Sequence, residues 1–542
     1  MRLLKAMLAL QEAKGAVTDA DLQRLARDEG VPLHRLQGLR SFYPAFREQP
    51  GPPVQIQLCR DVACRLAAGH DHCQRVRAAV GDRADVEVRE VSCIGLCDQA
   101  PAMLLNGQPR RGRLEDVRAC LGGTGSDSAC VAGTTPARRW PTDPYASPQA
   151  RYGSLRRLLA AGRPEEVIAS LKQAALRGLG GAAFPTGLKW ELTRHAAGAE
   201  KYVVCNADES EPGTFKDRLL LEQLPHLVVE GMLIGAWVIG ARRGIIYLRH
   251  EYVHAAQALR QEIERAYATG ALGQGIFGSD FGFDLELFIS PGGYILGEET
   301  ALLEALEDRR GEPRNKPPFP TNAGLHGRPT LINNVETFAA VPAICWHGPD
   351  WWASQGKPGY KGLKFVSVSG DVARPGVHCV PWGSTVREVL ELCGGVAGGR
   401  KLKAFSPGGA STPFLPASML DTPLDFDALK AVGSALGTGA MVFVAEHRNL
   451  LDVVLAQVRF FRNESCGKCV PCRLGSQKAV AMVEQVLAGA REALPVDLGE
   501  LHETMARTSI CGLGQVALLP LIDALRRFPR EPSLQSLRRV RS

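Results

Sequence analysis

The sequence predicts a multidomain α/β protein, and three observations carry that prediction. The chain has 542 residues, enough for about three to five domains of ~100 to 200 residues each. Apolar strand-like segments alternate with helical segments through its middle. A stretch rich in Gly, Ser, Thr and Pro at 122–150 separates that middle from the N-terminal part. With 45% apolar and 22% charged residues, the composition excludes disordered and collagen-like chains.

The charge distribution and the apolar runs limit the partners that we expect. The net charge is +7, but six arginines and one acid lie between Arg526 and the C-terminus, so the excess is a basic tail and not a nucleic-acid binding face. We expect this tail to be a solvated terminus, and docking to an acidic partner subunit is the alternative. The longest apolar stretch, Gly231–Ala241, is well short of the ~18 residues of a membrane-spanning helix. We therefore expect a cytoplasmic protein with no nucleic-acid partner and no membrane insertion.

The order of the elements divides the chain into six segments. Residues 1–48 predict a small helical cap, with Thr18 and Asp19 as N-cap candidates. Residues 49–121 predict a compact α/β unit, 122–150 a linker, 151–350 a mostly parallel sheet with helices, 351–446 a small α+β module, and 447–542 helices. The strands expected in the segment 151–350 are Tyr202–Cys205, Ile245–Leu248 and Leu285–Ile289.

One set of cysteines has the spacing of a cubane cluster. Cys466, Cys469 and Cys472 form a C-x2-C-x2-C run, and Cys511 follows at a distance. Three thiolates at steps of three with a remote fourth are typical of a 4Fe-4S cluster. A zinc site, which favours paired C-x2-C units, and unligated thiols are the alternatives.

A second set lies in the N-terminal α/β unit. Cys59 and Cys64 form one close pair, and Cys93 and Cys97 form another. Two pairs of thiolates suit a 2Fe-2S cluster, because each pair can hold one iron. Zinc is a serious alternative here. The remaining cysteines have no ligand spacing and are expected to be ordinary thiols: Cys73, Cys120, Cys130, Cys205, Cys345, Cys379 and Cys393.

Three loops are candidates for a nucleotide site. Arg177–Trp190 is rich in glycine and contains Lys189, while Asn206–Asp217 and Gly292–Thr300 each follow an expected strand. Open α/β sheets bind ligands at the carboxyl ends of their strands. A structural turn is the alternative for the first loop, and a solvated acidic face is the alternative for the other two. The literal G-x-G-x-x-G at Gly273–Gly278 follows a helix and precedes a strand, so it predicts a loop and not a dinucleotide site.

These residues resemble a known family, the flavin-containing, NADH-oxidising subunit of complex I with its relatives in soluble NAD-dependent hydrogenases and formate dehydrogenases. The likeness extends from about Arg151 to Pro529 and includes the three loops, Lys316–Pro320, Gly324–Thr337 and the cubane cysteines. Residues 1–121 resemble the companion 2Fe-2S subunit. The resemblance implies a thioredoxin-like 2Fe-2S domain, a Rossmann-like FMN domain, a β-grasp module and a C-terminal helical bundle with a 4Fe-4S cluster.

The resemblance also implies roles for individual residues. FMN would contact Gly178, Lys189, Asn206, Asp208, Tyr294, Gly297, Glu298, Asn333, Asn334 and Thr337. NAD(H) would contact Gly181, Phe184, Glu211, Glu299, Lys316 and Phe319, and Gly180 and Glu209 are further cofactor-binding candidates. Glu211 and Glu298 are the candidate catalytic residues.

With both units fused in one polypeptide, the chain resembles the beta (diaphorase) subunit of molybdenum- or tungsten-dependent NAD-linked formate dehydrogenase. The tract Pro407–Ser411 agrees with this weakly, because relatives carry similar tracts. The resemblance implies electron transfer between NAD(H), FMN and the two clusters. The implied partners are a large molybdenum- or tungsten-pterin iron-sulfur subunit and a further small iron-sulfur subunit. The alternatives are a flavin subunit of complex I or of an NAD-dependent hydrogenase and, in another class, a non-catalytic docking subunit.

Overall fold

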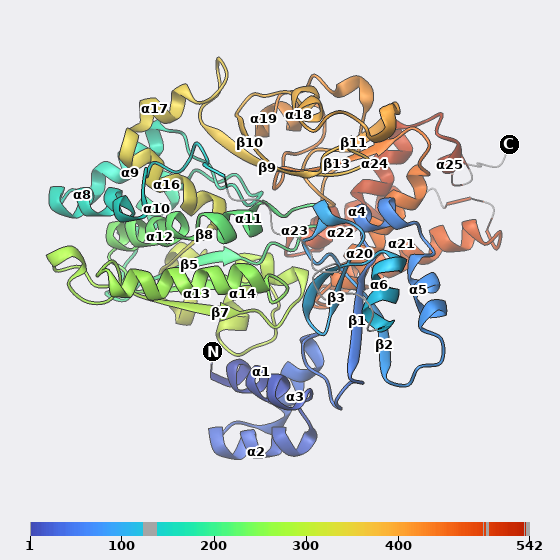
Figure 1. The fold of residues 1–542 in the computed structure, drawn as a ribbon, viewed down its shortest axis with the longest axis horizontal. Helices are drawn as coiled ribbons and strands as arrows, with labels where there is room; N and C mark the ends of the chain where they lie inside the picture. Colours follow the sequence, from blue (N-terminus) through green and yellow to red (C-terminus); the bar gives the residue numbers. More distant parts are fainter. Residues whose placement is uncertain (1, 123–137, 492, 495–497, 536, 538–542) are drawn as a thin grey trace.

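The computed structural model describes residues 2–122, 138–491, 493–494, 498–535 and 537. Over these residues it confirms a multidomain α/β protein with three separate sheets (Figure 1). The N-terminal helical cap lies at one end of the molecule, beside both the N-terminal sheet and the central helices (Figure 1). The predicted boundaries between the segments stay predictions, and one of them, at 350/351, falls within the helix α17 (Pro349–Ser354).

The cap consists of α1 (Arg2–Lys14), α2 (Asp19–Glu29) and α3 (Leu33–Phe42). Thr18 is the N-cap of α2, as predicted, and forms a capping box with Asp21. The cap is fixed to the central part of the chain: the Leu4 N–H donates to Asp308 Oδ1 at 2.9 Å, and the Tyr43 hydroxyl donates to the Arg309 carbonyl at 2.5 Å. The cap therefore packs as part of the larger body.

The N-terminal sheet has the strand order β2-β1-β3-β4. Its elements are β1 (Val54–Cys59), α4 (Val62–Ala68), α5 (His72–Val80), β2 (Val86–Val91), η1 (Cys97–Gln99), β3 (Ala102–Leu105), β4 (Gln108–Arg111) and α6 (Leu114–Gly122). Strand β1 pairs parallel with β2 and antiparallel with β3. Sequence patterning missed β4 because Gln-Pro-Arg-Arg is polar. Pro109 is tolerated there because β4 is an edge strand.

The central sheet is parallel throughout, with the order β7-β6-β5-β8. Its strands are β5 (Tyr202–Ala207), β6 (Arg243–Leu248), β7 (Asp284–Ile289) and β8 (Thr330–Asn334). Its helices are α8 (Gly153–Ala161), α9 (Pro164–Gln173), α10 (Thr186–His195), α11 (Lys216–Gln223), α12 (Pro225–Ile239), α13 (Val253–Ala268), α14 (Glu299–Leu306), α15 (Pro320–Ala323) and α16 (Val335–His347). Short η turns are η2 (Pro148–Ala150), η3 (Ile276–Gly278), η4 (Tyr294–Gly297) and η5 (Leu325–Gly327). Three strands were predicted, and β8, whose end is polar, was missed.

The predicted linker lies partly outside the described residues, at 123–137. The described remainder, 138–150, packs against the central helices. Trp140 and Tyr145 are buried, and the Tyr145 hydroxyl bonds to Glu230 of α12. Trp140 and Tyr145 stand among Pro and Ser residues and do not repeat at the spacing of a strand or a helix. The sequence pattern therefore could not predict this packing.

The third sheet has the order β10-β9-β13-β11-β12 and forms the β-grasp-like module. Its elements are β9 (Leu363–Gly370), β10 (Gly376–Pro381), α18 (Val386–Leu392), η6 (Ala397–Gly399), β11 (Leu402–Ser406), β12 (Leu415–Pro416), η7 (Ala417–Met419), α19 (Phe426–Ala431) and β13 (Ala440–Ala445). The C-terminal helices are α20 (Leu450–Glu464), α21 (Val470–Leu487), α22 (Leu498–Thr508), α23 (Gly512–Val516), α24 (Leu519–Arg527) and α25 (Pro532–Gln535).

Across the described ranges, we find no single helix long and apolar enough to cross a membrane. The helices α11 and α12 meet the length and composition criteria only as a pair, and they are bent by 93° relative to each other. Almost every residue of α12 is buried in this structure.

Candidate functional site

The candidate site lies where the central parallel strands end. Asn206 of β5 is paired in register with Asn334 of β8, so the two asparagines lie side by side at this edge. The Asn206 amide donates to the Gly297 carbonyl at 2.8 Å, and the Asn334 amide donates to Asp217 at 2.6 Å. The loops after β5, β7 and β8 therefore meet at one place, as expected for a ligand site of an open α/β sheet.

The glycine-rich loop is folded onto the same edge. The Leu179 N–H donates to Thr337 Oγ1 at 2.9 Å. A Cβ on Gly180 would lie 2.9 Å from the Cβ of Asn334, so a side chain there would displace Asn334. Gly181 has φ +111°, a conformation that favours glycine. The loop's glycines therefore permit a close approach to the strand ends.

Two lysines and two glutamates lie around the N-terminus of α14. Lys316 Nζ donates to Glu298 and to Glu299, each at 2.9 Å, and Lys189 Nζ lies 3.7 Å from Glu299. Glu298 is also the N-cap of α14 and accepts from the N–H groups of Thr300 and Ala301. Its carboxylate is thus held in a fixed position, and the lysines supply positive charge next to the glycine loop.

Glu211 is held by two other parts of the fold. Its carboxylate accepts from the Ser411 N–H at 2.6 Å, the Ser411 hydroxyl at 2.7 Å and the Tyr294 hydroxyl at 2.7 Å. Burial raises the pKa of Glu211, and these hydrogen bonds oppose that effect. Gly409 must lack a side chain, because a Cβ there would lie 2.6 Å from Glu211 Cγ. Sequence reasoning missed Ser411, although the tract Pro407–Ser411 contains it.

Asp208 and Glu209 are buried beside the same edge. Asp208 accepts from the hydroxyls of Ser210 and Ser290, and burial raises its pKa to about 7. Glu209 accepts from the N–H groups of Asp217 and Arg218 at the start of α11 and from Tyr252, and burial raises its pKa to about 7. The Glu209 carboxylate therefore binds the start of α11 and does not face an open space.

The remaining candidates lie around these groups. Asn333 accepts from the Trp190 indole at 2.9 Å, and the Gly178 N–H donates to the Phe184 carbonyl at 2.8 Å. The rings of Phe184 and Phe319 are 41% and 53% exposed, so both are accessible to a ligand from solvent. Gly273–Gly278 lies in the loop between α13 and β7, as predicted.

The four N-terminal cysteines converge between β1, α4 and the loop before η1. All four are buried. Cys93 Sγ lies 3.3 Å from Cys97 Sγ, and Cys59 is in hydrogen-bond contact with Cys64 and Cys93. The Gly95 N–H points to Cys93 Sγ at 3.4 Å. A buried group of four thiols fits the donor set of a 2Fe-2S cluster.

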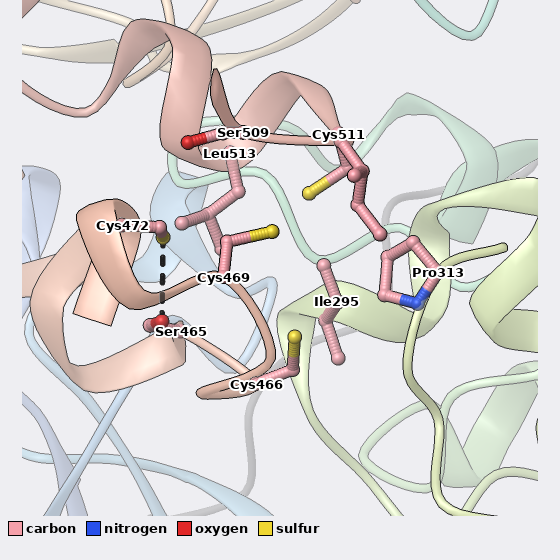
Figure 2. Close-up of a pocket in the computed structure, with 10 residues that line it drawn as sticks. Ile295, Pro313, Ser465, Cys466, Cys469, Cys472, Ser509, Cys511 and Leu513 are labelled. Carbon is pink, nitrogen blue, oxygen red and sulfur yellow. Dashed lines mark hydrogen bonds between the residues drawn. The ribbon is translucent and has the colours of Figure 1, made fainter. Parts of the chain in front are cut away.

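The four C-terminal cysteines line one pocket. Figure 2 shows the sulfurs of Cys466, Cys469 and Cys511 pointing towards its centre. Cys472 lies to one side, with its Sγ 3.3 Å from the Ser465 hydroxyl. Burial raises the pKa of Cys511 to about 11, while N–H groups of Gly514 and Leu513 oppose this by bonding to its sulfur. Amides aimed at the sulfur fit the surroundings of a 4Fe-4S cluster.

Neither set is arranged around a single ion. Among the residues that the structure describes, no three His, Cys, Asp or Glu side chains form a group that could hold one metal ion. In an iron-sulfur cluster the thiolates are distributed over several irons. Of the other cysteines, Cys130 lies outside the described residues, and none of the described ones is in a disulfide.

Four family descriptions match successive parts of the chain. Residues 1–118 match the thioredoxin-like 2Fe-2S ferredoxin, and residues 171–343 match the Nuo51 FMN-binding domain. Residues 365–415 match the SLBB domain, and residues 452–533 match the NADH-ubiquinone oxidoreductase-F iron-sulfur binding region.

Curated relatives are similar over most of the chain. The F 2 subunit of NADH-quinone oxidoreductase from Rhizobium meliloti is 43% identical over 70% of this chain and 91% of its own length. The corresponding F subunit from Escherichia coli is 44% identical over 70% of this chain and 86% of its own length. The alpha subunit of the NAD-reducing hydrogenase HoxS of Cupriavidus necator is 36% identical over 97% of this chain and 91% of its own length.

A solved structure is similar over nearly the whole chain. A chain of an NAD+-reducing NiFe-hydrogenase in the air-oxidised state superposes with a TM-score of 0.86 at 33% identity, covering 98% of this chain and 93% of that one. In the H2-reduced state the TM-score is 0.88 at the same identity.

Proposed function

Because this chain belongs to the family of NADH-oxidising flavin and iron-sulfur subunits that includes the F subunit of NADH-quinone oxidoreductase and the hydrogenase HoxS alpha subunit, we propose that its strand-end site binds FMN and NAD(H) while its two cysteine sets hold the clusters. The chain is an NAD-linked electron-transfer subunit with an FMN-binding domain, a 2Fe-2S domain and a 4Fe-4S region. The residue assignments are the proposal.

One observation carries the proposal: the loops of the strand-end site contact both cysteine loops. Arg249, which follows β6, bonds to the Cys93 carbonyl, and the Tyr294 N–H bonds to Glu464, two residues before Cys466. FMN, when bound, exchanges electron pairs with NAD(H) and single electrons with iron-sulfur clusters. A site that touches both cluster loops is placed for that exchange.

The protein's part is to bind and orient. We propose that FMN lies against Gly178, Lys189, Asn206, Asp208, Tyr294, Gly297, Glu298, Asn333, Asn334 and Thr337, and NAD(H) against Gly181, Phe184, Glu211, Glu299, Lys316 and Phe319. Gly180 would line the same cofactor site, and Glu209 would support it by holding the start of α11. The lysines would pair with phosphate groups, and the exposed rings of Phe184 and Phe319 would stack on a base. Glu211 and Glu298 would act from positions fixed by their hydrogen bonds.

The cluster ligands are proposed as two sets. Cys59, Cys64, Cys93 and Cys97 would hold the 2Fe-2S cluster, and Cys466, Cys469, Cys472 and Cys511 would hold the 4Fe-4S cluster. Reduction of an artificial dye by NADH, measured on the isolated chain with its FMN content, tests the enzyme function. A chain that binds FMN but reduces no dye would be a docking subunit instead.

We further propose that the partner is a large molybdenum- or tungsten-pterin iron-sulfur subunit that oxidises formate, with a further small iron-sulfur subunit. The relatives are themselves named as subunits of larger enzymes. The fused layout and the tract Pro407–Ser411 support this assignment only by resemblance. A hydrogenase partner is the second candidate, because the hydrogenase alpha subunit matches 97% of this chain.

Purification of the intact complex separates the two partners. Molybdenum or tungsten together with formate-dependent NAD+ reduction would support the formate dehydrogenase. Nickel together with hydrogen-dependent NAD+ reduction would support the hydrogenase.

A further inference from the structure

Two buried arginines of the central unit hold the loop that carries Cys93 and Cys97. Arg249 Nη2 donates to the Cys93 carbonyl at 2.7 Å. Arg218 Nη1 donates to the Gly95 carbonyl at 2.6 Å, and its Nη2 donates to Asp98 at 2.8 Å. Both side chains are almost fully buried. Two guanidinium groups thus bind main-chain oxygens of one short loop.

Gly95 of this loop lies close against the central unit. Gly95 has φ +75°, and a Cβ there would lie 2.4 Å from the ring of Tyr252. Tyr252 in turn donates to Glu209 at 2.8 Å, and Arg249 also bonds to the Glu209 carbonyl. Arg249 therefore contacts both the cysteine loop and the loop that follows β5.

The positive charge of Arg249 lies beside Cys93, because its Nη2 binds the Cys93 carbonyl. Glu251 opposes that charge: its carboxylate pairs with Arg249 Nη2 at 2.8 Å and with Nε at 3.0 Å. Asp61, whose carboxylate accepts from the Cys93 N–H at 2.6 Å, is a further buried acid beside this loop.

We infer that Arg249 is a positioning residue that docks the Cys93–Cys97 loop onto the flavin unit and raises the reduction potential of the 2Fe-2S cluster held there. The inference rests on the proposed assignment of these cysteines as ligands. Reduction adds a negative charge to the cluster, and a buried cation beside a ligand stabilises the reduced state. Glu251 moderates this effect, so the two side chains act on the potential with opposite signs.

The test is an anaerobic redox titration of the full chain, followed by EPR of the 2Fe-2S cluster. In Arg249→Met, the ratio of reduced to oxidised cluster at the wild-type midpoint falls about tenfold, which is 59 mV for a one-electron couple. Arg249→Lys keeps the charge and shifts the ratio less. Glu251→Gln shifts it upward, because the opposing charge is removed. Arg243→Met, at the exposed start of β6, leaves it unchanged.

The signs of the shifts separate an electrostatic role from a merely structural one. A clamp that acts only through packing would move the potentials of Arg249→Met and Glu251→Gln in the same direction, and that result would overturn the inference. An unchanged potential in Arg249→Met would do the same. If Arg249→Met assembles no cluster, the reduction potential of the 2Fe-2S cluster in Glu251→Gln is the test. A potential that is not higher than that of the wild type then contradicts the inference. A wild-type chain with no 2Fe-2S signal would instead overturn the ligand assignment itself.

Discussion

The Tyr294 N–H donates a hydrogen bond to the Glu464 carboxylate at 2.9 Å. Tyr294 belongs to the loop that follows β7, and its hydroxyl holds Glu211. Glu464 ends α20, immediately before Ser465 and Cys466, and it also accepts from the Ser92 hydroxyl, next to Cys93. One carboxylate therefore connects a loop of the strand-end site with both cysteine loops.

Replacement of Glu464 by Ala should loosen this junction. The Ala side chain offers no acceptor, so the Tyr294 N–H and the Ser92 hydroxyl both lose their partner. An unsatisfied donor costs about 1–3 kcal/mol. We expect amide hydrogen exchange in the Gly292–Gly297 segment to accelerate by about tenfold, since 1.4 kcal/mol corresponds to that factor. Mass spectrometry of that peptide measures it, and Glu446→Ala, on an exposed turn, is the control. Unchanged exchange would show that the contact contributes nothing.

The cysteine sets predict the iron content of the purified chain. One 2Fe-2S and one 4Fe-4S cluster amount to about six irons. Cys93→Ser should reduce this to about four and Cys469→Ser to about two. Anaerobic iron and sulfide analysis measures both. Cys73→Ser is the matched control, because Cys73 lies in the same unit as Cys59 and Cys64 but has no ligand spacing. Zinc in the N-terminal set, or a loss of iron in Cys73→Ser, would contradict the assignment.

Glu211→Gln should weaken NADH turnover while FMN stays bound. Three donors converge on this carboxylate, and Gln removes its negative charge and reverses the hydrogen bond with the Tyr294 hydroxyl. We expect kcat/KM for NADH to fall about tenfold or more. Glu299→Gln, which removes the charge partner of Lys316, should act in the same direction. Steady-state NADH oxidation with flavin content measured in parallel gives the result, and Glu191→Gln, on α10 away from these contacts, is the control. A kcat/KM for NADH equal to that of the wild type in both variants would mean that these carboxylates have only a structural role.

Glu230 predicts a pH-dependent stability that is independent of the cofactors. It is fully buried in α12, accepts from Tyr145, and burial raises its pKa to about 7. The folded protein therefore binds the proton more tightly than the unfolded chain, and ionisation removes stability as the pH rises from the unfolded pKa towards 7. Glu230→Gln removes that penalty.

The Tm of Glu230→Gln relative to wild type should therefore increase between about pH 5.5 and about pH 8.5. Differential scanning calorimetry at both pH values measures it. The exposed Glu264→Gln on α13 should show no such trend. A Tm difference for Glu230→Gln that is constant or falls with pH would contradict the linkage.

Local patterns predicted much of the fold but not its contacts between units. The strands β5, β6 and β7 are apolar and were expected, whereas β8 ends in Asn333 and Asn334 and was missed because the polar end breaks the pattern. The cap residue Thr18 was predicted because an N-cap is set by neighbouring residues. Trp140 and Tyr145 are buried through tertiary contacts, and no helix or strand periodicity in the sequence predicts such contacts.

The same distinction applies to the candidate site. Loops after strands and cysteine spacings are local signals, so the strand-end loops and both cysteine sets could be predicted. Ser411, Arg249 and Glu464 lie far along the chain from the groups that they contact. Their roles depend on how the N-terminal unit, the β-grasp module and the C-terminal helices pack against the central unit, and one sequence carries no signal for that.

The central claim is that this chain exchanges electrons with NAD(H) at the strand-end site and with its partner through the 4Fe-4S region. The most direct test is rapid-mixing absorbance of flavin reduction, recorded beside overall turnover of the complex, in wild type, Cys469→Ser and the double variant Cys93→Ser/Cys97→Ser. We predict that NADH reduces the flavin in all three, that the double variant keeps much of the overall turnover, and that Cys469→Ser loses it. Full turnover in a Cys469→Ser complex shown to lack the 4Fe-4S cluster, or a flavin that NADH does not reduce in the wild type, would contradict the account.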